Sequence, residues 1–266
     1  MKRTLSLLLS LLLAAALTGC RAETPAPEPS APAGDPAPVE QPVPAPAETP
    51  AETPAEPLPV TYTIEHTDLS EGLPIDMYFE IPVFTGGGEA IARINADLAA
   101  LRDGYVENEA PNVLDLVRAD LADGGTADGA RYLNAHSASV PTCTDTLISV
   151  IISYEWWLGG VTDYGAQTRT YDAVTGDVLT LPDLVEGTDE EILETVVAAL
   201  LEQYPGVEEQ GVMESPMDTI RAMDPRSIEF YVQDGAVHVC FAKYEIAYGA
   251  AGAFDVTLPG AIRARS

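Results

Sequence analysis

Cys20 stands in the sequence context that most clearly predicts a chemical modification. A charged start, Lys2-Arg3, precedes an apolar run from Leu5 to Leu17, which is shorter than the about twenty residues that a membrane-spanning helix needs. The run ends in Thr18-Gly19-Cys20, and small residues before a cysteine are typical of the site at which lipoprotein signal peptides are cleaved. We therefore predict a signal peptide over residues 1–19 and a diacylglycerol on Cys20. The alternative is a plain secreted protein with an incidental cysteine.

The other two cysteines, Cys143 and Cys240, both fall on predicted strands. Outside the cell, two thiols can form a disulfide when their Cα atoms lie within about 7 Å of each other. The sequence does not show whether the two strands are neighbours. The pair is therefore either a candidate disulfide or two small buried side chains.

Familiar catalytic motifs do not occur in the sequence. It lacks a Gly-x-Ser-x-Gly elbow and a Gly-x-x-x-x-Gly-Lys phosphate loop, and His66, His136 and His238 have no partner at the spacing of a zinc site. Carboxylates are abundant, but no two of them stand out as an acid–base pair. We therefore predict no catalytic residue, no metal and no cofactor, and expect a protein that is not an enzyme.

Trp156 and Trp157, just before Gly159 and Gly160, form the most suggestive local feature. Adjacent residues on a strand face opposite sides of the sheet, so we expect one indole in the core and the other exposed beside the glycine loop. An exposed tryptophan there is suited to stacking on a sugar or anchoring a protein partner. The alternative is a sheet covered on both faces, which buries both rings.

The excess of acidic over basic residues limits the kinds of molecule that the protein can bind. The chain holds 42 Asp and Glu against 13 Lys and Arg, a formal net charge of −29. Nucleic acid and anionic lipid surfaces need a basic face, so neither is expected as the main partner. A basic protein or a cation fits this charge; the alternative is that acidity only keeps an exported protein soluble and monomeric. We expect a monomer.

Residues 20–59 predict a disordered linker behind the lipidated cysteine. From Arg21 to Pro59 there are thirteen prolines and seven acidic residues, with few sizeable apolar side chains, and such a composition cannot build a core. An extended chain of this kind spans about 3.1 Å per residue. We therefore expect the linker to hold a folded domain away from the outer face of the bacterial cytoplasmic membrane, to which the lipid attaches it.

Residues 60–266 predict a soluble α+β unit. Alternating or clustered β-branched and aromatic residues predict strands at 60–66, 75–84, 147–154, 164–174 and 254–258, and Asp234-Gly235 predicts a hairpin between 230–232 and 237–241. Apolar residues three and four positions apart predict helices at 91–105, 114–121 and 192–204, the last opened by a capping box from Thr188 to Glu191, and Ser215-Pro216 opens a shorter one. Hairpins dominate these connections, so we predict a mainly antiparallel sheet packed against two or three helices.

Several stretches together resemble a known domain family. They are Ile148 to Trp157 with Gly159-Gly160, Thr168 to Asp172, Leu181 to Val185, Phe230-Tyr231, Asp234-Gly235, Tyr244 to Ala247 and Ala250 to Gly252. On these residues the chain resembles the extracellular domain shared by the lysozyme-sensing anti-sigma factor RsiV and the non-catalytic part of the deacetylase PdaC. In that resemblance, 60–130 is a smaller strand-and-helix module and 131–266 is the RsiV/PdaC-like C-terminal domain. Two departures stand out: Thr162 replaces the family's His, and Lys243 replaces its Pro.

The resemblance implies a domain that binds an extracellular ligand without catalysis. The ligand is expected to be a basic protein such as lysozyme, or a cell-wall component such as peptidoglycan. Tyr244 and Glu245 join Trp156, Trp157, Gly159 and Gly160 as candidate ligand-facing residues. Because only Met1 to Arg3 precede the signal core and no deacetylase motif is present, neither a transmembrane transducer nor a deacetylase is expected. The alternative function is a wall-modifying hydrolase with a site built from scattered carboxylates.

Overall fold

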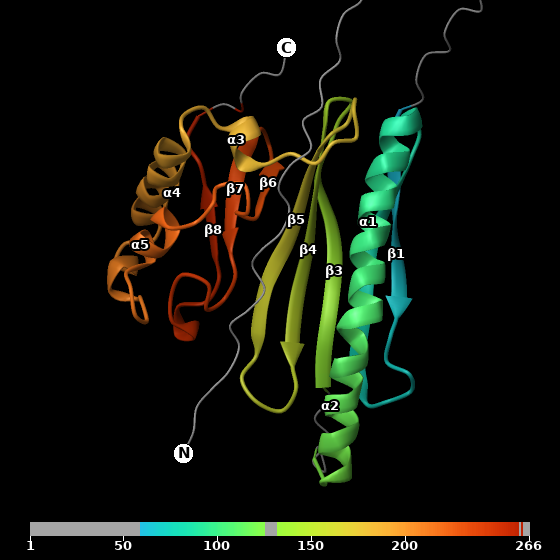
Figure 1. Cartoon of the computed structure of the whole chain (residues 1–266). Coiled ribbons are helices and arrows are strands. Elements are labelled where there is room, and N and C mark those ends of the chain that lie inside the picture. The colour runs from blue at the N-terminus through green and yellow to red at the C-terminus, as the bar shows by residue number, and fades with distance from the viewer. Residues whose placement is uncertain (1–58, 126–131, 261, 263–266) are drawn as a thin grey trace, which may run out of the picture. The chain divides into compact units, whose positions relative to one another are not determined.

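The computed structural model describes residues 59–125, 132–260 and 262. The predicted signal peptide, the lipidation site Cys20 and the linker up to residue 58 lie outside this part of the chain. All described residues belong to one compact unit that combines helices with two sheets (Figure 1). The prediction of an α+β fold is therefore confirmed.

A five-stranded sheet with the order β1-β2-β3-β4-β5 forms the centre of the unit. Three of its four pairings are antiparallel, as predicted, and β2 pairs with β3 in parallel. Two helices lie between β2 and β3 in the chain, and a parallel pair needs such a crossover. The elements are β1 (Thr61–Asp68), β2 (Ile75–Thr85), α1 (Gly88–Asn108), α2 (Ala110–Ala122), β3 (Tyr132–Cys143), β4 (Leu147–Trp157) and β5 (Asp163–Asp172). The sheet thus joins strands from both predicted modules.

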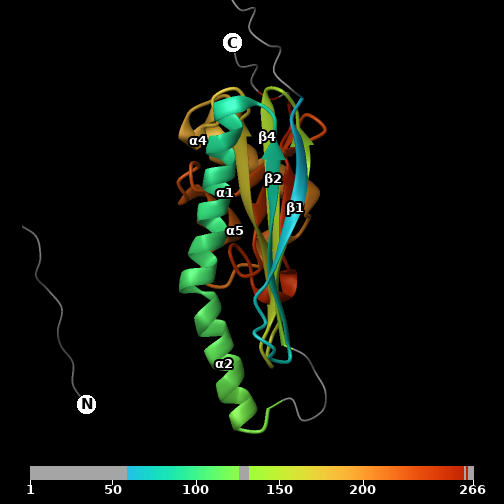
Figure 2. The ribbon, with the colours of Figure 1, turned by 90° about the vertical axis from the view of Figure 1, so that its right-hand side faces the viewer.

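Helix α1 covers one face of this sheet (Figures 1 and 2). Most of its apolar stripe is buried and packs in one cluster with alternate side chains of β2, including Met77 and Phe79. Burial of each large apolar side chain contributes roughly 1.5–3 kcal/mol, so this face anchors the sheet. The helix also contributes a polar contact, because the buried Tyr105 hydroxyl donates to Asn134 Oδ1 at 2.6 Å.

A second, three-stranded antiparallel sheet has the order β6-β7-β8 and packs against α4. The predicted capping box closes around Thr188 and Glu191 at the start of α4. The predicted hairpin turns at Asp234 and Gly235, with φ values of 51° and 77°, and positive φ at both positions is what a two-residue hairpin turn requires. The elements are α3 (Leu181–Leu184), α4 (Asp189–Gln203), η1 (Val207–Glu209), α5 (Pro216–Arg221), β6 (Phe230–Gln233), β7 (Ala236–Phe241), η2 (Gly249–Ala251) and β8 (Phe254–Thr257).

Hydroxyl side chains join the two sheets. Ser149 and Thr168, on the face of the large sheet opposite α1, are 0% and 5% exposed. Ser149 Oγ accepts a hydrogen bond from Val232 N at 2.9 Å, and Thr168 Oγ1 accepts one from Phe230 N at 2.8 Å. Since β6 pairs only with β7, its other edge would otherwise bury unsatisfied backbone groups, which cost free energy. The edge of the small sheet is therefore held by the face of the large one.

No helix among residues 59–125 and 132–260 is both long enough and apolar enough to cross a membrane.

Candidate functional site

Two open clefts lie beside the β3–β4–β5 part of the large sheet and meet at Tyr154 and Ala166, which line both. The first, here named the acidic cleft, has a volume of about 970 Å³ and extends from α1 to the segment after β7. The second, here named the tyrosine cleft, has a volume of about 760 Å³ and lies between the large sheet and strands β7 and β8.

Aromatic rings line the acidic cleft under α1. His136 stacks on Phe79, with ring centroids 4.8 Å apart and planes 19° apart, and its ring lies 4.4 Å from that of Tyr105. Burial lowers the pKa of His136 to about 4, so the imidazole is neutral at physiological pH. Trp156 completes this lining and is 37% exposed. The cleft therefore offers ring faces without a positive charge from histidine.

Carboxylates form the charged part of the acidic cleft. Four acidic residues line it, and the lining residues that the structure describes include no Lys or Arg: the acids are Glu109, Asp163, Glu229 and Glu245. Glu229 Oε2 accepts hydrogen bonds from Thr168 N at 2.5 Å and Thr168 Oγ1 at 2.6 Å. Glu245 keeps contact with solvent at the rim, yet burial raises the pKa of its carboxyl, and the charge on Glu229 adds to the rise. The cleft is thus a site of negative potential.

The tyrosine cleft has a different lining. Its aromatic residues are five tyrosines and two phenylalanines, namely Tyr78, Tyr154, Tyr164, Tyr204, Tyr231, Phe241 and Phe254. Gly165 is the cross-strand partner of Tyr154, and a Cβ added there would lie 2.6 Å from Tyr154 Oη. Glycine at this position therefore allows the Tyr154 ring to lie across β5 and to reach both clefts.

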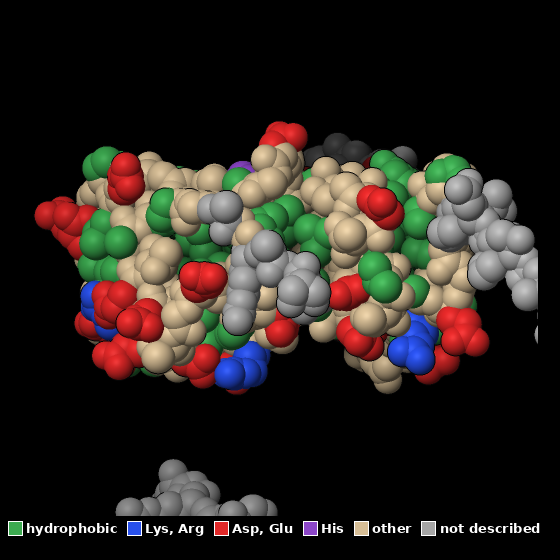
Figure 3. Space-filling model, turned by 90° about the horizontal axis from the view of Figure 1, so that it is seen from above, with side chains coloured by type: hydrophobic (Ala, Val, Ile, Leu, Met, Phe, Trp, Pro, Cys, Tyr) green, Lys and Arg blue, Asp and Glu red, His purple; other side chains and the backbone are tan. Residues whose placement is uncertain are grey.

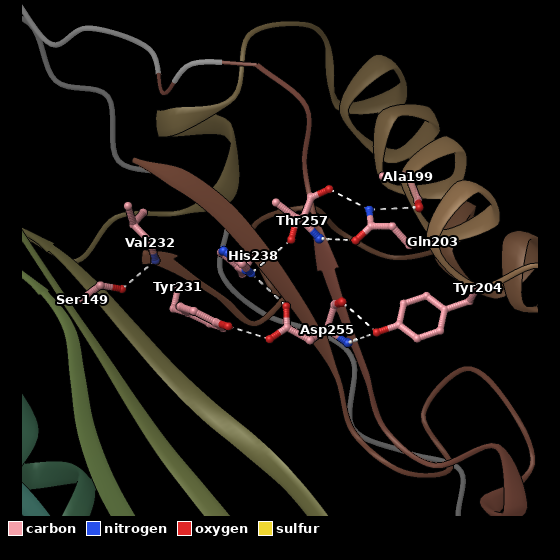
Figure 4. Close-up of polar contacts among 9 residues, drawn as sticks. All are labelled: Ser149, Ala199, Gln203, Tyr204, Tyr231, Val232, His238, Asp255 and Thr257. Carbon is pink, nitrogen blue, oxygen red and sulfur yellow. Dashed lines mark hydrogen bonds and ion pairs between the residues drawn. The ribbon is translucent and has the colours of Figure 1, made fainter. Parts of the chain in front are cut away.

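A hydrogen-bond network fixes the wall that β7 and β8 give to the tyrosine cleft (Figure 4). The Tyr231 hydroxyl donates to Asp255 Oδ2 at 2.5 Å, and His238 Nδ1 lies 3.0 Å from Asp255 Oδ1. The Tyr204 hydroxyl donates to the Asp255 carbonyl at 2.8 Å, and Gln203 Oε1 accepts from Thr257 N at 3.0 Å. These side chains bond the outer edge of β8 in place of another strand, which blocks pairing there with a second chain.

The structure brings together only some of the candidate ligand-facing residues. Trp156 and Glu245 line the acidic cleft, whereas Tyr244, which is 52% exposed, and the exposed Gly159 and Gly160 line neither cleft. The expectation that one indole enters the core is wrong. Trp157 is half-buried because it lies at the end of β4, where its Nε1 donates to the Gly160 carbonyl at 2.8 Å.

For several cleft residues, no motif or spacing in the sequence predicts a place in a binding site. Glu229 lies in the segment before β6, and its role depends on Thr168, 61 residues away. Asp163 and Tyr164 begin β5, and their sequence context predicts only a strand. The alternation of β4 and β5 does place Tyr154 and Tyr164 on strands. That they line one cleft together with residues of β8 depends on how the two sheets pack.

The candidate disulfide is not present in the structure. Cys143 and Cys240 both carry free thiols, because Cys143 packs against the cluster under α1 and Cys240 lines the tyrosine cleft from the other sheet. Burial raises the pKa of Cys240 to about 12, which makes it a poor nucleophile. The described residues also contain no group of three His, Cys, Asp or Glu side chains placed to hold a metal ion.

Comparison with known proteins informs the fold. No family model and no curated protein matches the chain. The chain is similar to the crystal structure of a member of the DUF3298 family from Bacteroides fragilis NCTC 9343, with 14% identity, coverage of 77% of this chain and 92% of that one, and a TM-score of 0.52. A DUF3298 family protein from Pseudomonas aeruginosa PAO1 has 16% identity, coverage of 78% and 95%, and a TM-score of 0.42. DUF3298 is the RsiV/PdaC-like domain family, and the chain shares its fold with the Bacteroides member.

Proposed function

We propose that this chain is a bacterial cell-surface lipoprotein whose folded domain binds a basic extracellular protein, such as lysozyme, without catalysing a reaction. The observation that carries the proposal is the acidic cleft, in which four carboxylates and several aromatic rings face one open space with no Lys or Arg among the described lining residues. A lysine or arginine side chain of a partner fits such a lining, because carboxylates pair with its charge and ring faces attract it.

The charge of the whole domain supports this proposal. Residues 60–266 hold 10 Lys and Arg against 35 Asp and Glu. Each of the six described arginines lies within 4.0 Å of a carboxylate, so the positive charges are neutralised locally. Figure 3 shows the result on the upper face, where acidic side chains are scattered widely and basic ones are few. Such a surplus speeds the approach of a basic partner, mostly at low salt.

Calorimetry tests the proposal. The mature chain with Cys20→Ser is titrated with lysozyme and with a lysine-rich peptide at low and physiological salt. We expect binding that weakens with salt, and a roughly tenfold loss in Trp156→Ala and in Asp163→Asn, the size of one charge or ring contact. Glu202→Gln is the matched control, because Glu202 is an exposed carboxylate on α4 outside both clefts. Absence of binding to either cationic probe at low salt, or an equal loss in the control, contradicts the proposal.

One observation favours a second function, a wall-modifying hydrolase. Burial raises the pKa of Glu245, which lines the acidic cleft together with Glu229, whose carboxylate accepts two hydrogen bonds. A carboxyl group whose pKa is raised by its surroundings is suited to act as a general acid. Purified chain is incubated with peptidoglycan, and released fragments are measured. Turnover that disappears in Glu245→Gln while the circular dichroism spectrum is unchanged favours the hydrolase over pure binding.

A further inference from the structure

We propose that the tyrosine cleft is a second binding site and that its ligand is an uncharged polysaccharide strand. This site adjoins the acidic cleft at Tyr154 and Ala166. Its ligand class follows from three observations: the aromatic lining, the way in which the rings are held, and the polar groups that remain free.

The lining matches the two-sided chemistry of a sugar ring. A pyranose has a face of C–H groups that packs against an aromatic ring, and a rim of hydroxyls that needs hydrogen-bond partners. Tyr164 is 38% exposed at the mouth of the cleft, and Tyr78, Tyr154 and Tyr204 are half-buried along it. An open cleft lined by several tyrosines suits a strand of several sugar units.

Neighbouring groups hold these rings before any ligand arrives. The Tyr78 hydroxyl lies 3.0 Å from Ser137 Oγ, and its ring lies 4.8 Å from that of His66. Tyr231 stacks on His238 with ring centroids 4.7 Å apart (Figure 4). The Tyr204 ring packs edge-on against Phe254, with centroids 5.1 Å apart. Because little side-chain freedom is left to lose, the cost of ordering the cleft on binding is small.

The remaining polar groups favour a ligand rich in hydroxyls. Ser153 and Glu155 lie on β4, line the cleft and are exposed, and neither side chain has a hydrogen-bond partner among the residues that the structure describes. Glu155 and Asp255 are the acidic residues of the lining, which includes no described Lys or Arg. The nearby Lys243 Nζ donates to the Thr162 carbonyl. The ammonium of Lys243 lies 5.4 Å from the Tyr164 ring but does not line the cleft. The carboxylates of Glu155 and Asp255, which do line it, repel a phosphate, sulfate or uronate, whereas sugar hydroxyls find both acceptors and a donor.

The test uses the mature chain with Cys20→Ser and three uncharged hexasaccharides: chitohexaose, cellohexaose and maltohexaose. Calorimetry is expected to show binding of at least one of them, insensitive to salt. Tyr164→Ala should weaken that binding about tenfold through loss of one ring contact, and Ser153→Ala should weaken it to a smaller extent. Tyr62→Ala is the matched control, because Tyr62 is 41% exposed on β1 and lies outside the cleft.

Three results would overturn this proposal: no binding of any hexasaccharide, an equal loss in Tyr62→Ala and Tyr164→Ala, or binding of a proline-rich peptide with no binding of sugar. The two proposed sites are distinguished by crossing the variants. Tyr164→Ala should keep its affinity for the lysine-rich peptide, and Asp163→Asn should keep its affinity for the sugar, so that failure of one site leaves the other testable.

Discussion

The side-chain ammonium of Lys243 donates a hydrogen bond to the backbone carbonyl of Thr162. Thr162 and Lys243 are two positions at which the chain departs from the domain pattern that it resembles, and in the folded chain they touch. Lys243 N also donates to the Tyr164 carbonyl at 3.1 Å, a bond that a proline could not make. Lys243 therefore ties the β4–β5 loop to the segment after β7 through its ammonium and its backbone N–H.

Replacement of Lys243 by Ala should loosen this tie. The substitution removes a charged hydrogen bond and the contacts of the ammonium with the rings of Tyr164 and Tyr244, at 5.4 and 5.0 Å. We expect the free energy of unfolding in urea to fall by about 1–2 kcal/mol. Arg93→Ala, which removes an exposed ion pair to Asp177, serves as control and should change it by about 0.5 kcal/mol or less. Equal changes in the free energy of unfolding of the two variants would show that the Lys243 contacts stabilise the domain no more than an exposed ion pair does.

Thr168 should be among the most sensitive polar residues of the domain. Its hydroxyl donates to Glu229 Oε2 and accepts from Phe230 N. Thr168→Val therefore leaves the buried Phe230 N–H without this partner and removes one of the two hydrogen bonds to Glu229 Oε2, while it preserves shape. We expect a loss of about 2–3 kcal/mol in urea unfolding. Thr61→Val is the control, because the Thr61 hydroxyl bonds only the exposed Thr85 side chain. A loss in Thr168→Val no larger than that of the control would contradict this role.

The elements that the sequence predicts correctly are those whose cause is local. The capping box at Thr188 and Glu191 starts α4 through bonds within four residues, and the turn at Asp234-Gly235 requires only the backbone freedom of two residues. A prediction that all strands of the large sheet are antiparallel would be wrong for β2 and β3, which pair in parallel. The direction of this pair is set by the helical crossover between the two strands and not by the residue pattern of either strand.

The clefts depend on causes that are not local. In the sequence, Ser149 and Thr168 look like ordinary exposed polar residues of a strand. They are buried because the edge of β6 packs on them and takes its hydrogen bonds from their hydroxyls. Glu229 has no distinguishing neighbour in the sequence, and Glu245 joins it only through the segment after β7. The candidate site could therefore be predicted at Trp156 and Glu245, whereas its remaining residues follow from the packing of one sheet on the other.

His136 should make the domain less stable in mild acid. Burial lowers its pKa in the folded state to about 4, below the ordinary value of 6.5. As the pH falls below 6.5, the unfolded chain binds a proton that the folded chain does not, so stability is lost between about pH 6.5 and 4. At pH 5 this loss should reach about 2 kcal/mol relative to pH 7.

His136→Phe provides the comparison, since phenylalanine keeps a ring stacked on Phe79 and cannot bind a proton. Urea unfolding at pH 7 and pH 5 should show a smaller loss in this variant than in the parent chain. Protonation of surface carboxylates acts on both proteins alike and cancels in the difference. An identical pH dependence would mean that His136 titrates with an ordinary pKa in the folded state.

The two thiols of the domain should be free but slow to react. Cys143 and Cys240 are unpaired with each other in the structure, and burial raises the pKa of both, that of Cys240 to about 12. Since the thiolate is the reactive form, iodoacetamide at pH 8 should modify the native mature chain with Cys20→Ser much more slowly than the unfolded one. In guanidinium without reductant, mass spectrometry should then show two additions. Two additions that appear only after reduction would instead establish the disulfide.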